Sequence, residues 1–171
     1  MKKYEFTGET KQVELSFGTV TLHRIKAVAE FGIVKVGDLG GWIEKEENLS
    51  HDGNAWVYGN AWIYGNAKVY GDAEVYGNAK VYGDAEVRGD AKVYSISHVL
   101  VIGPIGSRND FTTFFRDKDS EITVKCGCFI GKIDKFLEKV CETHGDSKYA
   151  IVYRAAVEIA KQQIDLSEEK Q

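Results

Sequence analysis

A six-residue repeat governs what this chain can fold into. Residues 53 to 94 read GNAWVYGNAWIYGNAKVYGDAEVYGNAKVYGDAEVRGDAKVY, with glycines six residues apart. In each hexad an alanine is followed two residues later by Val or Ile, and this spacing places both side chains on one face of a short strand. Gly followed by Asn or Asp supplies a bend, because these residues tolerate positive φ. A helix is excluded, since each interior glycine would cost roughly 1 kcal/mol.

The number of hexads in one coil follows from charge. From Lys68 onward the residue between Ala and Val alternates between Lys and Glu. With three hexads per coil, residues 18 apart are stacked, so that Lys68 lies beside Glu86 and Glu74 beside Lys92. Two hexads per coil would stack like charges, which is unfavourable. The alternation therefore predicts a three-sided coil of 18 residues.

The hexad Val-Tyr-Gly-Asp-Ala-Glu resembles the motif of the hexapeptide-repeat, left-handed parallel β-helix proteins. This resemblance implies a short triangular β-helix, and its left-handedness comes from the resemblance alone, because right-handed crossovers are the physical rule. The stretch GDLGGWIEKEENLS, with the repeats after it, also resembles a recurrent type of phage and prophage protein, often labelled polymer-forming. We therefore expect a mainly β fold of about two to three coils.

The flanks extend this fold class. Residues 12–36 have the alternation and glycines of two or three strands, and Trp42 and Ile43 are expected to cover the open end of the solenoid. After the repeats, strands are predicted at 99–103, 111–116 and 121–129, followed by two helices, the second from Asp146 or Ser147 to about 164. We expect a β cap at 1–52, a solenoid at 53–97, an α+β module at 98–164 and a tail at 165–171.

Aromatic residues recur on the outward face of the repeat. Tyr follows the aliphatic residue in most hexads, and the 18-residue coil stacks Tyr on Tyr. Such rows are enriched at interfaces, although Tyr also favours strands and stacks on itself. The rows predict a homo-oligomer, a trimer or a dimer, with an interface formed by Trp56, Tyr58, Trp62, Tyr64, Tyr76 and Tyr82.

Composition limits the function classes. The net charge of −4 argues against a nucleic-acid surface, and no apolar run approaches the length of a membrane span. Three cysteines, all late in the chain, fit a reducing cytoplasm, which would be that of a bacterial host cell if the chain is phage-encoded. Nothing in the sequence predicts a cofactor or a metal ion.

A glycine-rich loop, GPIGSRND at 103–110, follows the first predicted strand of the C-terminal module. Its backbone N–H groups can converge on an anion, and Arg108 adds a planar fork. It is not a P-loop, because no Lys-Ser/Thr follows. The alternative is a tight turn with a surface Arg. The expected binding residues are Gly103, Gly106, Ser107, Arg108, Asn109, Thr112 and Arg116.

Catalytic candidates are weaker. Cys126 and Cys128 would share one strand face, and with His144 they could form a metal site or a nucleophile pair, or they could simply be core residues. His51 and His98 flank the repeat, and hexapeptide acyltransferases use a solenoid histidine as a base. Those enzymes build many coils and an extruded loop, whereas this chain has 42 repeat residues and no insertion.

These observations favour a non-catalytic oligomer that binds a small phosphorylated, nucleotide-like ligand through its C-terminal module. In a phage-type protein such binding would sequester a signal nucleotide as an anti-defence sponge. One alternative is a purely structural or protein-interaction solenoid. A second is an enzyme, either acyltransferase-like or cysteine-dependent.

Overall fold

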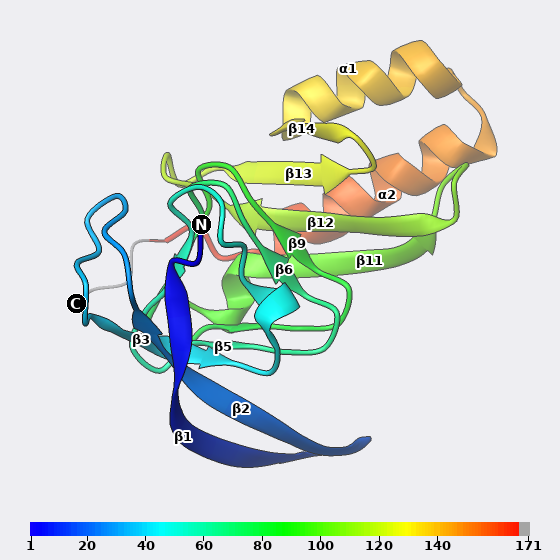
Figure 1. Cartoon of the computed structure of the whole chain (residues 1–171). Coiled ribbons are helices and arrows are strands. Elements are labelled where there is room, and N and C mark those ends of the chain that lie inside the picture. Colours follow the sequence, from blue (N-terminus) through cyan, green and yellow to red (C-terminus); the bar gives the residue numbers. More distant parts are fainter. Residues whose placement is uncertain (168–171) are drawn as a thin grey trace. The chain divides into compact units, whose positions relative to one another are not determined.

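The computed structural model describes residues 1–167, so the last four residues of the expected tail lie outside the described part of the chain. The chain divides into two compact units, one ending at Ile96 and the other beginning at Ser97. Figure 1 shows both units and labels many of their helices and strands. Within the described residues, neither helix is long and apolar enough to cross a membrane.

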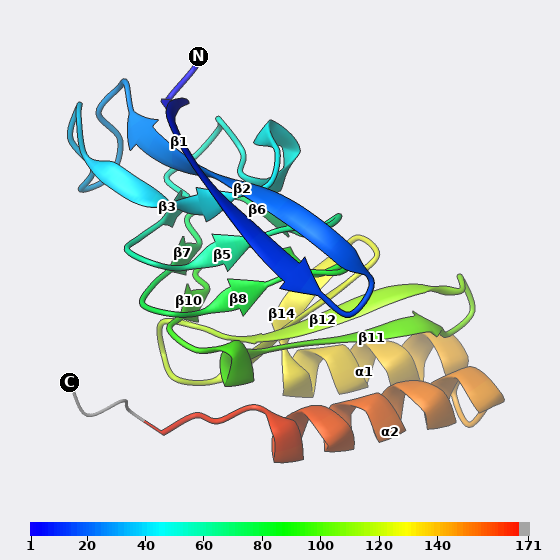
Figure 2. The same ribbon diagram turned by 90° about the horizontal axis from the view of Figure 1, so that it is seen from below.

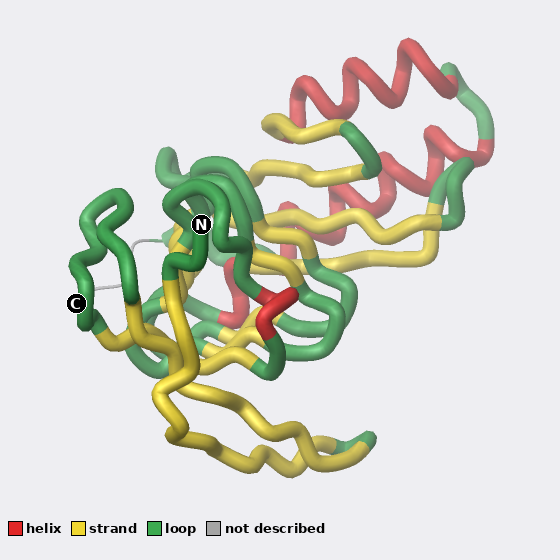
Figure 3. Tube along the Cα trace, in the orientation of Figure 1, coloured by secondary structure: helices red, strands yellow, loops and turns green. Residues whose placement is uncertain are grey.

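The N-terminal unit begins with a long hairpin of β1 (Tyr4–Leu15) and β2 (Gly18–Ala27), which pair antiparallel. Next come β3 (Leu39–Ile43) and the short 3-10 helix η1 (Glu46–Asn48). The repeat then supplies seven strands of two residues: β4 (Trp56–Val57), β5 (Trp62–Ile63), β6 (Lys68–Val69), β7 (Glu74–Val75), β8 (Lys80–Val81), β9 (Glu86–Val87) and β10 (Lys92–Val93). Figure 3 shows how much of the repeat is loop between these strands.

The predicted register of 18 residues is confirmed. β4 pairs with β7 and β7 with β10, β5 pairs with β8, and β6 with β9, all in parallel. Lys68 lies opposite Glu86 in this register. Figure 2 shows β5 above β8 and β7 above β10. The apolar residues of the repeat are almost fully buried as a result: Ala55, Val57, Ala61, Ile63, Ala67, Val69, Ala73, Val75, Ala79, Val81, Ala85, Val87, Ala91 and Val93.

The fold class expected from the resemblance, a short triangular left-handed parallel β-helix with caps, is wrong. Residues 1–167 form four separate small sheets: a mixed one of β1-β2-β3-β5-β8, two small parallel ones, β10-β7-β4 and β6-β9, and an antiparallel one. The repeat strands are only two residues long, and a glycine with positive φ lies two residues after each strand from β4 to β9 and ends its pairing. The hairpin β1–β2 and strand β3 extend the sheet that contains the repeat strands β5 and β8. The repeat motif does not predict this extension.

Strand β3 covers the first strands of the repeat. Trp42 and Ile43 pair in parallel with Trp62 and Ile63, and Leu49 bridges to Val69. The two residues expected to cover the end of the repeat therefore do so as a strand. Gly41 permits this close approach, since a Cβ there would lie 2.6 Å from the Ala61 carbonyl oxygen.

The C-terminal unit is an antiparallel sheet packed on two helices. η2 (Ile96–His98) leads into β11 (Val99–Ile105), which pairs with β12 (Asp110–Arg116); β13 (Ile122–Cys126) and β14 (Phe129–Lys132) complete the sheet. The helices α1 (Ile133–His144) and α2 (Lys148–Gln163) follow, with Ser147 at the N-cap position of α2. The predicted strands at 99–103 and 111–116 and both helices are confirmed.

Two local predictions for this unit are wrong. The stretch 121–129 is two strands, because Gly127 adopts a φ of 56° and turns the chain, so Cys128 lies in a turn and not on a strand face with Cys126. The helical spacing also predicts Tyr149, Val152, Ala156 and Ile159 on the inward face of α2; Ala156 is buried, but Val152 and Ile159 are 38% and 52% exposed. The inward face consists of Ala150, Tyr153, Ala156, Val157 and Ala160.

Candidate functional site

A pocket of about 210 Å³ lies within the C-terminal unit. Its walls come from the β11–β12 turn, the β13–β14 turn and both helices. It brings together residues that the sequence presented as two separate hypotheses, the glycine loop and the Cys–His group. The lining residues are Ser107, Arg108, Asp110, Cys126, Gly127, Cys128, Phe129, Phe136, Lys139, Val140, Thr143, His144 and Tyr153.

The glycine loop is a tight hairpin turn. Gly106 has a φ of 74°, and the Asn109 amide donates a hydrogen bond to the Gly106 carbonyl at 3.3 Å. The other expected binding residues do not line the pocket. Thr112 and Arg116 are buried in β12, where the Arg116 guanidinium donates to Ser120 Oγ at 2.8 Å, and Gly103 packs against Phe111.

Tyr153 of α2 lies directly beneath this turn. A Cβ on Gly106 would come within 1.9 Å of the Tyr153 hydroxyl, so only glycine leaves room for it. Burial raises the pKa of Tyr153 to about 12, with a further increase from Cys126, while hydrogen bonds from the Ser107 hydroxyl and amide act in the opposite direction. Tyr153 is therefore a neutral phenol at neutral pH, and the Ser107 donors are already directed at its oxygen.

Arg108 is the unopposed cation of the pocket. It is exposed on the turn, and its guanidinium lies so close to Gly127 that a Cβ there would be 3.1 Å from Nη1. No ion pair joins Arg108 to an acidic group among residues 1–167. Lys139, the other cation of the lining, pairs with Glu142 at 3.7 Å. The Asp110 carboxylate accepts a hydrogen bond from the Phe111 amide.

The catalytic candidates Cys126, Cys128 and His144 all reach this pocket. Thr112 Oγ1 and Cys126 Sγ are hydrogen-bonded at 3.3 Å, and Cys128 is exposed in its turn. His144 ends α1, with its ring centroid 5.7 Å from that of Tyr153. In the part of the chain that the structure describes, these three do not form a group close enough to hold one metal ion.

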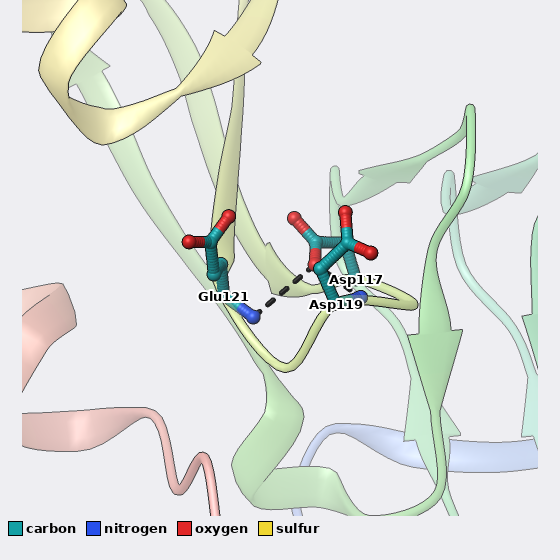
Figure 4. Close-up of side chains that lie close together, drawn as sticks. All are labelled: Asp117, Asp119 and Glu121. Carbon is teal, nitrogen blue, oxygen red and sulfur yellow. Dashed lines mark hydrogen bonds between the residues drawn. The ribbon is translucent and has the colours of Figure 1, made fainter.

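The close group of possible metal ligands is Asp117, Asp119 and Glu121, drawn in Figure 4. Lys132 already occupies its centre, with Nζ 2.5, 3.3 and 2.7 Å from the three carboxylates. Burial alone would raise the pKa of Asp117, but hydrogen bonds from Lys132, Thr123 and the amides of Glu121 and Asp119 hold that pKa below its usual value. This group is an internal ion-pair network that fixes the β12–β13 turn.

The network makes the stability of the C-terminal unit depend on pH. The pKa of Asp117 is lower in the folded protein than in the unfolded chain. The ionised carboxylate therefore stabilises the fold fully above the unfolded-state pKa near 4, and this stabilisation is lost as the pH falls through the folded-state pKa. We expect Asp117→Asn to cost about 2 kcal/mol at pH 7, and the difference from wild type to shrink below pH 4. Urea unfolding followed by helix circular dichroism checks this, since α1 and α2 both lie in this unit. A difference that stayed constant from pH 7 to pH 2.5 would contradict the assignment.

The histidines that flank the repeat have different surroundings. His98 is 2% exposed. His51 lines an open groove of about 680 Å³ with Glu46, Glu47 and Tyr70 among others. Its Nδ1 accepts a hydrogen bond from the Lys3 amide at 3.3 Å, and burial lowers its pKa, with Glu46 opposing and Lys3 adding to the shift. The neutral imidazole therefore carries its proton on Nε2, which makes that nitrogen a donor and not a base.

The outward rows of the repeat stack as predicted. Tyr58 lies on Tyr76 and Tyr76 on Tyr94, with centroids 4.5 and 4.9 Å apart, and Tyr64 lies on Tyr82 at 5.1 Å. Not every proposed interface residue is accessible, however. Trp56 is 1% exposed, with Tyr4 and Phe31 against its ring, and Tyr64 is 7% exposed. Trp62 lies under Lys80 and Lys11. Self-association through the remaining tyrosines stays a prediction.

No family model matches the chain. Part of it is similar to the "Uncharacterized acetyltransferase YdcK" of Escherichia coli (strain K12), with 36% identity over 62 residues. The match covers 34% of this chain and 19% of that protein, so the chain spans about a fifth of the relative. This gives distant support to the resemblance to hexapeptide-repeat proteins and favours the acyltransferase-like alternative over a sequestering role. It gives no support to the phage or prophage resemblance.

Proposed function

We propose that the C-terminal unit binds a small organic anion in the pocket between its two hairpin turns and its helices. The observation that carries the proposal is the unopposed guanidinium of Arg108 at this cavity. Lys139 has a carboxylate partner and Arg108 has none among the described residues, so an incoming anion gains a full charge-assisted contact.

The turn that carries Arg108 is also restrained. Tyr153 holds it through the Ser107 hydroxyl and amide, and the guanidinium lies beside Gly127. A guanidinium on a restrained turn loses less side-chain entropy on binding than one on a free loop. The anion contact therefore falls to Arg108, while the Ser107 donors hold the turn.

Arg108→Ala is expected to weaken anion binding about tenfold to a hundredfold, because a hydrogen bond to a charged group contributes roughly 1.5–3 kcal/mol. Stability should change little, since the side chain is exposed. Calorimetric titration with a panel of organic acids and phosphates measures the affinity, and a melting curve measures the stability.

Lys135→Ala is the matched control, because Lys135 is an exposed cation of the same unit outside the pocket. It should leave affinity unchanged. The proposal fails if no anion binds the wild type below about 10 mM, a threshold near −3 kcal/mol. It also fails if both variants lose affinity equally, because the effect would then be one of net charge.

A second candidate function is acyl transfer, which the similarity to an acetyltransferase favours. The geometry of His51 does not supply the base, since its Nδ1 is engaged by Lys3 and its Nε2 carries the proton. In this chain the acceptor would have to be deprotonated by another group. An assay for thiol release from acetyl-coenzyme A, run with small amines and alcohols as acceptors, decides between the two candidates.

A further inference from the structure

We infer that the ligand of the C-terminal pocket is a small planar aromatic monocarboxylate, not a nucleotide or inorganic phosphate. This inference rests on the proposed function and adds the chemical class of the ligand. It follows from the composition of the walls, the size of the cavity and the balance of charge around it.

Three aromatic side chains form the apolar part of the pocket wall. Phe129 enters from the start of β14, Phe136 from α1 and Tyr153 from α2. The Phe129 and Phe136 rings are tilted with centroids 5.4 Å apart, and Phe136 meets Tyr153 edge-on at 5.6 Å. Rings held at such angles offer both a face and an edge to a further ring, which is the geometry that aromatic pairs prefer.

The size of the cavity limits the ligand. A volume of about 210 Å³ is below the range of roughly 300–1,000 Å³ that suits drug-sized ligands. A cavity of this size suits a ligand built on a single ring better than one of drug size. One six-membered ring with a carboxylate has this size, whereas a whole nucleotide is about twice as large.

The charge around the cavity suits one negative charge. Of the Arg and Lys residues that line the pocket, Arg108 has no carboxylate partner among the described residues and Lys139 is paired with Glu142, while Asp110 adds a negative charge to the lining. A phosphate dianion would meet one free cation and one carboxylate. A carboxylate matches the planar fork of Arg108 with a single charge and two acceptor oxygens.

The test is an NMR-detected titration of the full chain with four probes: benzoate, acetate, benzyl alcohol and inorganic phosphate. Benzoate should saturate the protein with a Kd on the order of 0.1–1 mM, as expected for a ligand of this size. Acetate lacks the ring, benzyl alcohol lacks the charge, and each should bind at least about tenfold more weakly. Ring-current shifts from benzoate should fall on Phe129, Val140 and Tyr153.

Two variants distinguish the contribution of the aromatic wall to benzoate binding from that of the Arg108 guanidinium. Phe129→Leu keeps apolar bulk and should weaken benzoate about two- to tenfold while leaving acetate unchanged. Arg108→Lys keeps the charge but loses the fork, and it should weaken benzoate more than phosphate. If Phe129→Leu does not fold, the ring-current shifts in the wild type still test whether benzoate lies against the aromatic side chains.

The failure of this inference is distinct from failure of the proposed function. If acetate or phosphate binds as tightly as benzoate, and Arg108→Ala abolishes that binding, the aromatic assignment is overturned and anion binding stands. If none of the four probes, nor a nucleoside monophosphate, binds in an Arg108-dependent way, both are overturned.

Discussion

Replacing Val81 with aspartate is expected to unfold the repeat. Val81 is 1% exposed and pairs with Ile63 in β5, so the new carboxylate would lie among the apolar side chains between the sheets. A buried charge without a partner costs several kcal/mol, and protonation would replace this cost with that of an unsatisfied polar group. We expect the buried aspartate to lower the free energy of unfolding by about 3–5 kcal/mol, which is comparable with the whole stability of a small domain.

Tryptophan fluorescence during urea unfolding measures this effect selectively, because Trp42, Trp56 and Trp62 all lie in the N-terminal unit. The matched control is Asn78→Asp, which adds the same charge at an exposed corner where other hexads carry Asp. Elsewhere in the repeat Asn54 donates to Asp72 and Asn66 to Asp84, so the carboxylate introduced by this control could accept likewise from Asn60. A Val81→Asp protein as stable as this control would show that Val81 is not in the core.

Asn48→Leu is expected to cost about 3–5 kcal/mol, the second large effect. Asn48 is 0% exposed at the end of η1. Its amide group donates to the carbonyls of Gly65 and Ala67 at 3.2 and 2.9 Å, and its Oδ1 accepts from the Lys45 amide at 2.9 Å. Leucine has a similar volume but would leave three backbone groups without this partner, each costing about 1–3 kcal/mol when buried.

Asn66→Leu is the comparison, since Asn66 is exposed and its side chain donates to the Asp84 side chain at 3.1 Å. Its cost should stay within about 0.5 kcal/mol. If both substitutions cost the same in thermal and urea unfolding, the hydrogen bonds of Asn48 do not hold η1 to the repeat. The prediction would then be wrong even though the contacts exist.

The sequence by itself determined the register of the repeat. The sign alternation from Lys68 to Lys92 selected the pairing 18 residues apart, and the observed pairs follow it. The same spacing predicted the stacked tyrosines, and it also accounts for Arg88, whose guanidinium lies 5.0 Å from the centroid of the Tyr70 ring. These features could be predicted because every hexad has the same pattern of residue types. A coil of 18 residues then places Val beside Val, Tyr beside Tyr and Lys beside Glu.

The strands and helices of the C-terminal unit could also be predicted from the sequence, but the buried face of α2 could not. α2 offered two apolar stripes, one with Val152 and Ile159 and one with Ala150 and Ala160, and the structure buries the second. Hydrophobicity favours the larger residues, yet the small side chains and Tyr153 fit the core that includes Phe114 and Phe136. Which stripe faces inward is decided by the partner surface, which local periodicity does not encode.

Only the tertiary structure assembled the candidate site. The sequence indicated Ser107 and Arg108 as one group and Cys126, Cys128 and His144 as another, and folding places both around one pocket. It gave no sign of Tyr153, whose hydroxyl takes the hydrogen bonds that the loop was expected to offer a ligand. A hydrogen bond between residues distant in the chain leaves no trace in spacing or composition, because its geometry exists only once sheet and helix have packed.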